Sequence, residues 1–236
     1  MGKIALLAAT SLLVFYALSM SSCKGKDSAN GGGGGKADAN AGVVVNDKEV
    51  QSPIPPAPSA APLSAVALTG ETEYDLETAL KQPADKVYRL KLKGLTDKIP
   101  DEVFKFNNLQ ELTFMSCKLT ALPVGIVHFQ NLTNLVFYDT PNIEALPNDW
   151  SKLKNLEYIR FNSGSKLTGF PASFGDLPKL SRLALVGGKH AFTVFPAPLL
   201  KLKNLTDFNF SGAITEVPEE IAQLEKLSSL SFHNGK

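Results

Sequence analysis

Few residues in this chain have the types and spacing that catalysis or metal binding requires. The histidines His128, His190 and His233 lie far apart, and none stands in the short spacing of metal ligands. The glycines of 31–35 are not followed by the Lys-Ser/Thr pair of a phosphate-binding loop, and no nucleophile elbow occurs. We therefore predict no enzyme, no metal site and no cofactor.

The first cysteine, Cys23, stands directly after a segment with the features of a secretory signal peptide. Residues 1–22 combine a basic start at Lys3 with an apolar stretch over 4–17, which is too short to cross a hydrocarbon core of ~30 Å. The small residues at 21–22 before Cys23 resemble the lipobox of bacterial lipoproteins, although Met20 replaces the usual leucine.

The lipobox resemblance implies cleavage before Cys23 and attachment of acyl chains, such as palmitate, to this residue. It implies an anchor in the bacterial cell envelope, at the outer membrane or the cell surface. An ordinary signal peptide followed by an incidental cysteine is the alternative. Residues 23–70 are rich in glycine and then in proline, with few large apolar side chains. We expect this segment to be a disordered tether.

A repeat of 22 to 25 residues dominates the chain from residue 87 onward. Leucine or another apolar residue recurs at positions one, four and six of each copy, and an apolar-proline pair follows each copy. The first positions are Val87, Leu109, Leu132, Leu156, Leu180, Leu205 and Leu227. The fourth and sixth positions alternate along a short strand and point to the same side, and the proline then ends the strand.

These repeats resemble the leucine-rich-repeat family over residues 87–236. The resemblance implies an α/β repeat fold, a right-handed solenoid with about seven short parallel strands on its concave face. One repeat buries too little apolar surface to offset its chain entropy, so the copies must stack. Cys117 stands where the family carries a small buried polar residue, which indicates a structural role. Thr140, Gly164 and Gly188 replace that residue in later copies and predict less regular turns, and 187–190 is interpreted as a loop.

The two ends of the solenoid differ. Residues 71–86 predict an N-terminal capping helix that starts at the N-cap Asp75 and ends before Pro83. After the last predicted strand only four residues, 233–236, remain. Either this strand frays, or a partner covers it, or the sequence is truncated.

The concave face is the candidate binding surface. The net charge of the chain is only +1, and acidic and basic residues balance in the repeats, so nucleic acid is not an expected partner. Tyrosine, methionine and arginine are typical of interfaces. Outward positions of the central strands carry such residues together with valines: Met115, Val136, Tyr138, Tyr158, Arg160, Arg182 and Val186. Variable residues without a ligand are the alternative.

Two functions follow from these patterns. The first is a lipid-anchored protein-binding module of the cell envelope, with an unidentified protein ligand on the concave face and the membrane held through Cys23. The second is a structural envelope protein that associates with itself through its repeats or through an uncapped C-terminal edge.

Overall fold

The computed structural model describes residues 51–163, 165–214 and 216–233. The predicted signal peptide 1–22, Cys23 and the first part of the predicted tether lie outside the described residues, as does Gly164. In the described ranges, no helix has the length and apolar character needed to cross a membrane.

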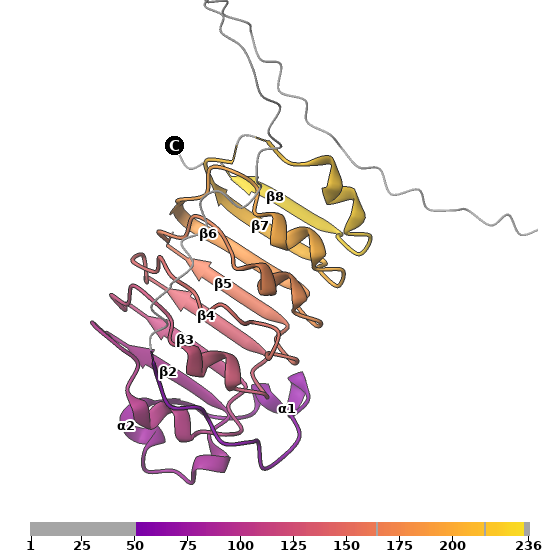
Figure 1. The fold of residues 1–236 in the computed structure, drawn as a ribbon. Helices are drawn as coiled ribbons and strands as arrows, with labels where there is room; N and C mark the ends of the chain where they lie inside the picture. Colours follow the sequence, from indigo (N-terminus) through magenta and orange to yellow (C-terminus); the bar gives the residue numbers. More distant parts are fainter. Residues whose placement is uncertain (1–50, 164, 215, 234–236) are drawn as a thin grey trace, which may run out of the picture. The chain divides into compact units, whose positions relative to one another are not determined.

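The described chain forms one sheet of eight parallel strands that lie side by side in chain order (Figure 1). The strands are β1 (Glu73–Asp75), β2 (Arg89–Lys93), β3 (Glu111–Met115), β4 (Asn134–Tyr138), β5 (Tyr158–Asn162), β6 (Arg182–His190), β7 (Asp207–Gly212) and β8 (Ser229–His233). Strands β2 to β8 are the seven that the repeat predicts, and β1 is an additional strand. The fold is therefore a leucine-rich-repeat solenoid.

Alternation along each strand builds the core. The side chains at repeat positions four and six lie in strands β2 to β7 and are at most 1% exposed, from Leu90 and Leu92 in β2 to Phe208 and Phe210 in β7. Position six carries phenylalanine in three successive strands. The rings of Phe114, Phe137 and Phe161 stack nearly parallel, with centroids 5.0 and 4.5 Å apart. Stacking of equivalent side chains between copies thus supplies the burial that one copy lacks.

The prolines of the repeat start short helices on the side opposite the strands. The 3-10 helices η2 (Asp101–Lys105), η3 (Val124–His128), η4 (Ala172–Asp176), η5 (Ala197–Lys201) and η6 (Glu219–Gln223) each follow a proline. The proline carbonyl accepts the backbone N–H three residues later, as from Val103 to Pro100 at 3.0 Å. The copy between β4 and β5 has no helix. There the indole Nε1 of Trp150 donates to the Pro147 carbonyl at 2.8 Å. In the other copies a backbone N–H three residues after the proline makes this hydrogen bond.

The segment 71–86, predicted as a capping helix, contains the unpredicted strand β1 and a short helix at the predicted start. Helix α2 (Leu76–Ala79) starts at Asp75, whose carboxylate accepts the Thr78 N–H at 2.7 Å. This hydrogen bond lowers the pKa of Asp75 below its usual value. The 3-10 helix η1 (Ala84–Lys86) then leads into β2. At the other end, β8 pairs with β7 on one side only within the described chain, and Leu230 and Phe232 are 40% and 38% exposed.

The turns that follow the strands are more regular than predicted at one position. Cys117 is buried, and its Sγ lies 3.4 Å from the Met115 carbonyl, as its structural role predicts. The Thr140 hydroxyl donates to the Tyr138 carbonyl at 3.0 Å, so this turn is equivalent rather than irregular. The predicted excursion at 187–190 lies within β6 as a bulge, because Leu185 pairs with Phe210 and the next pair with β7 is His190 with Gly212.

The prediction of a disordered tether is wrong for residues 51–70. We call this segment the strap, because it runs along the repeats and ends in helix α1 (Ala65–Thr69). Asn108 Oδ1 accepts the N–H groups of Ser59 and Ala60, and Asn131 donates to the Ala60 carbonyl. Polar groups of the repeats thus hold the strap, and its own few large apolar side chains do not reveal these contacts.

Candidate binding surface on the outer face of the sheet

The pairing register of the sheet places equivalent residues of neighbouring copies beside one another. The outer face of the sheet points away from the core and is the face predicted to be concave. On this face Met115 pairs with Tyr138, and Val136 pairs with Arg160. Tyr158 pairs with Arg182, and Asn162 pairs with Val186. Neighbouring strands lie about 4.8 Å apart, so the predicted residues form one continuous patch over β3 to β6. We call these seven residues the outer-face patch.

Members of the outer-face patch differ in how much surface they offer. Arg182 is exposed, and Tyr138 is 37% exposed. Met115, Tyr158, Arg160 and Val186 are half-buried. Val136 is only 6% exposed, so it supports its neighbours and has little area for a partner.

Two arginines of the patch lie over two tyrosine rings. The guanidinium of Arg182 lies 4.7 Å from the ring centroid of Tyr158, and that of Arg160 lies 5.9 Å from that of Tyr138. Arg160 Nη1 also lies 3.5 Å from the Tyr158 hydroxyl. Cation–π contacts restrain these side chains before any partner arrives, which reduces the entropy cost of binding.

Among the described residues, ion pairs compensate charge on the outer face at one end of the sheet. Arg89 pairs with Glu111 at 3.0 Å, and Lys91 pairs with Glu73. In the described ranges, no carboxylate forms an ion pair with Arg160 or Arg182. The centre of the patch therefore presents positive charge beside aromatic surface. A partner with carboxylates and apolar side chains would complement it.

The histidines do not form a reactive site with one another. His128 is half-buried near Lys152, and burial lowers its pKa. His233 is exposed at the end of β8. Across the described ranges, no group of three histidine, cysteine or acidic residues could hold a metal ion.

His190 has a partner that the sequence did not indicate. Its Nδ1 lies 3.0 Å from the Ser165 hydroxyl, and both side chains are buried, at 3% and 4% exposure. Burial lowers the pKa of His190 to about 4. Because neither side chain reaches the surface, the pair has no access to a substrate and serves the interior of the solenoid.

One further feature was not predicted from the sequence. Helix α1 of the strap faces the first residues of the strands and forms one wall of a pocket with them. No signal in the repeat pattern could have located it, because the strap was interpreted as a tether.

Comparison with known proteins identifies similar folds among solved structures. No known protein-family profile matches the chain, and no curated protein matches it. Internalin C2 of Listeria monocytogenes is 18% identical over 72% of this chain and 84% of its own, with a TM-score of 0.44. The leucine-rich-repeat domain of the type III effector XopL is 19% identical over 62% and 69%, with a TM-score of 0.43.

A plant receptor also resembles the chain over part of its length. The leucine-rich-repeat ectodomain of the Arabidopsis thaliana receptor kinase GASSHO1/SCHENGEN3, in complex with Casparian strip integrity factor 2, is 21% identical over 67% of this chain. The TM-score is 0.45, and the match spans 22% of the receptor chain. The matches concern the solenoid fold alone.

Proposed function

We propose that this chain is a protein-binding module, anchored in the bacterial cell envelope by lipid on Cys23, that captures its ligand on the outer face of the sheet. The proposal assigns it no catalytic activity. The observation that carries it is the pairing of Tyr138 with Arg160 and of Tyr158 with Arg182. Tyrosine and arginine dominate the residues that contribute most binding energy at protein interfaces.

The anchor rests on the sequence before and at Cys23. Residues 51–233 contain a second cysteine, Cys117, which is buried. Metabolic labelling of the full chain with palmitate should therefore be lost in Cys23→Ser and retained in Cys117→Ser. Label retained in Cys23→Ser would remove the lipid anchor from the proposal.

The ligand-binding part is tested with tyrosine variants of the full chain. Proteins captured from envelope and host extracts by the wild type are identified, and their affinity for Tyr138→Ala and Tyr158→Ala is measured. We expect each substitution to weaken binding by about 2 kcal/mol, about thirty-fold, while the melting temperature changes little.

Val194→Ala is the matched control, because Val194 is an exposed apolar residue outside the patch, at 74% exposure. It should leave binding unchanged. Equal binding by the wild type and both tyrosine variants would contradict the proposal.

A second function, self-association in the envelope, has one observation in its favour. The strand β8 exposes Leu230 and Phe232, and the described chain pairs it on one side only. Exposed edge strands with apolar side chains can pair with another chain. The two functions need different surfaces, so they can be separated by substitution.

A further inference from the structure

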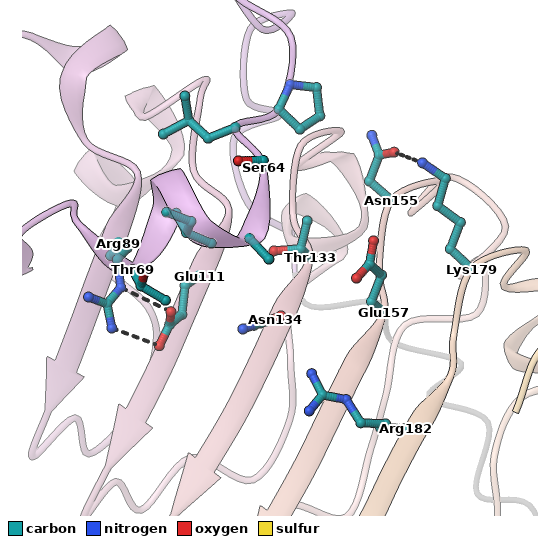
Figure 2. A pocket seen from close by; sticks show the side chains of 14 residues that line it. Ser64, Thr69, Arg89, Glu111, Thr133, Asn134, Asn155, Glu157, Lys179 and Arg182 are labelled. Carbon is teal, nitrogen blue, oxygen red and sulfur yellow. Dashed lines mark hydrogen bonds and ion pairs between the residues drawn. The ribbon is translucent and has the colours of Figure 1, made fainter. Parts of the chain in front are cut away.

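A pocket of about 550 Å³ lies between helix α1 and the first residues of the strands. This volume lies in the range of small-molecule sites in proteins. Figure 2 shows α1 on one side of the pocket, with Asn155, Glu157, Lys179 and Arg182 on the other side. The pocket exists because the strap folds onto the repeats.

The two walls of the pocket differ in chemistry. The strap contributes Pro62, Leu63, Ala65 and Leu68. Leu68 is buried and fixes the position of α1, whereas Ala65 is exposed. This wall is mostly apolar and offers contact area to an aliphatic group.

The opposite wall carries charge, and part of this charge is already compensated. Arg89 Nε lies 3.0 Å from Glu111 Oε2, and Arg89 Nη1 donates to the Glu71 carbonyl at 3.0 Å. The charges at the starts of β2 and β3 are therefore already paired within the protein. These two lining residues therefore offer a ligand no unpaired charge.

The charges near β5 and β6 are available. Glu157, Lys179 and Arg182 are exposed. Lys179 Nζ donates to Asn155 Oδ1 at 2.7 Å, and Arg182 lies over the ring of Tyr158. Among the described residues, none forms an ion pair with the Glu157 carboxylate. Glu157, Lys179 and Arg182 thus line one side of the pocket, and none of the three forms an ion pair among the described residues (Figure 2).

We propose that this pocket binds a short peptide with free termini and an apolar side chain. The peptide carboxylate pairs with Arg182, its ammonium group pairs with Glu157, and its apolar side chain contacts the strap. Glu157 directly precedes β5 and Arg182 begins the neighbouring β6, so the two charges lie within reach of one peptide of two or three residues, which spans up to about 10 Å. Charge-assisted hydrogen bonds at both ends give such a ligand its orientation.

The test uses calorimetric titration of the full chain with the tripeptide Ala-Leu-Ala, its N-acetylated form and its C-amidated form. We expect saturable binding of the free tripeptide, and at least ten-fold weaker binding of each blocked form. Arg182→Gln should weaken binding of the free tripeptide as much as C-amidation does. It should not lower the affinity for the amidated tripeptide any further. Glu157→Gln should weaken binding of the free tripeptide as much as N-acetylation does, and it should not lower the affinity for the acetylated tripeptide any further. Ala65→Trp, which fills the space beside α1, should abolish binding.

Lys226→Gln is the control for loss of a cation outside the pocket, where Lys226 Nζ donates to Asn204 Oδ1 at 2.6 Å. It should bind the tripeptide like the wild type. No saturable binding, or binding that Glu157→Gln and Ala65→Trp leave unchanged, would overturn the proposal.

Tyr138→Ala separates this site from the outer-face patch, since Tyr138 does not line the pocket. It should leave tripeptide affinity unchanged. If the tripeptide fails to bind while Tyr138→Ala still lowers protein capture, the pocket proposal falls and the proposed function stands.

Discussion

His190 is the residue whose environment departs most from that of a surface histidine. Its ring is buried between Phe192 and Phe210, at centroid distances of 6.4 and 6.2 Å, and its Nδ1 contacts Ser165. Burial disfavours the charged imidazolium and lowers the pKa from 6.5 to about 4. Below pH 6.5 the unfolded chain therefore takes up a proton that the folded chain does not.

We expect the free energy of unfolding to decrease as the pH falls from 6.5 towards 4, because the protonated unfolded state gains relative to the neutral native state. One pKa unit corresponds to about 1.4 kcal/mol, so the full shift contributes up to about 3 kcal/mol. Urea unfolding of the full chain at pH 7.0, 5.5 and 4.5 measures this decrease. His190→Gln should flatten the profile, since glutamine retains hydrogen bonding to Ser165 without titrating.

The matched variant is His128→Gln. The pKa of His128 is also lowered by burial, but its side chain is only half-buried beside Lys152. We expect this variant to retain most of the pH dependence of the wild type. If His190→Gln retains it equally, the histidine buried at β6 is not its source.

At the scale of elements, the strap accepts a hydrogen bond from an asparagine whose equivalents in later repeats donate to the preceding repeat. Asn131, Asn155 and Asn204 occupy the same position of the repeat. Asn155 and Asn204 donate to carbonyls of the preceding copy, those of Gln130 and Pro178, whereas Asn131 donates to Ala60 of the strap. The strap thus takes over a hydrogen bond that elsewhere joins neighbouring copies.

Gly125 allows the strap to approach η3. A Cβ at this position would lie 2.4 Å from the Pro53 carbonyl oxygen and 2.6 Å from the Ser52 hydroxyl, which also accepts the Gly125 N–H at 2.7 Å. The equivalent residues of η2 and η6 are Glu102 and Glu220. The repeat therefore carries glycine where the strap crosses it.

Asn108→Ala should release the strap. The Asn108 amide accepts two strap N–H groups and donates to Ser59 Oγ and to the Asp85 carbonyl, so its loss leaves several polar groups unpaired. We expect a loss of about 1–3 kcal/mol in the free energy of unfolding and faster proteolysis within residues 51–63. Limited proteolysis followed by mass spectrometry locates the cuts.

Asn204→Ala controls for loss of an asparagine at the same repeat position away from the strap. It should leave cleavage within residues 51–63 at the wild-type rate. Equal cleavage of Asn108→Ala and wild type would show that Asn108 does not hold the strap.

At the scale of the whole solenoid, the two ends of the sheet are treated differently. The first end is covered by β1 and α2, which pack on β2. Within the described chain, the apolar side chains of β8 pack on β7. For example, the ring centroids of Phe210 and Phe232 lie 6.2 Å apart. Exposed apolar side chains on a strand paired on one side can pair with another chain, so the proposed self-association would use β8.

If self-association is a function of this chain, its average mass in analytical ultracentrifugation rises with concentration. The double variant Leu230→Lys and Phe232→Lys should then remain monomeric, because two charges oppose pairing at the edge. Val194→Lys, at an exposed apolar residue away from β8, should associate like the wild type. A mass that is independent of concentration in the wild type excludes the structural alternative and leaves ligand capture.

The sequence by itself determined the features that depend on local periodicity. The spacing of leucine and proline predicted seven strands, the inward residues from Leu90 to Phe210 and the turns that follow each strand. Asp75 marked the start of α2 correctly, because an N-cap is a contact over three residues. The members of the outer-face patch could be chosen for the same reason, since alternation along a strand fixes which side chains point outward.

Only the tertiary structure decided the features that join distant segments. The strap contacts Asn108 and Gly125 from about 50 to 70 residues away, and no repeat pattern encodes such contacts. Ser165 and His190 meet across 25 residues, and Val136 on the outer face is only 6% exposed. Burial and hydrogen bonding of this kind arise from how the copies stack and how the strap folds back, so they become visible only in three dimensions.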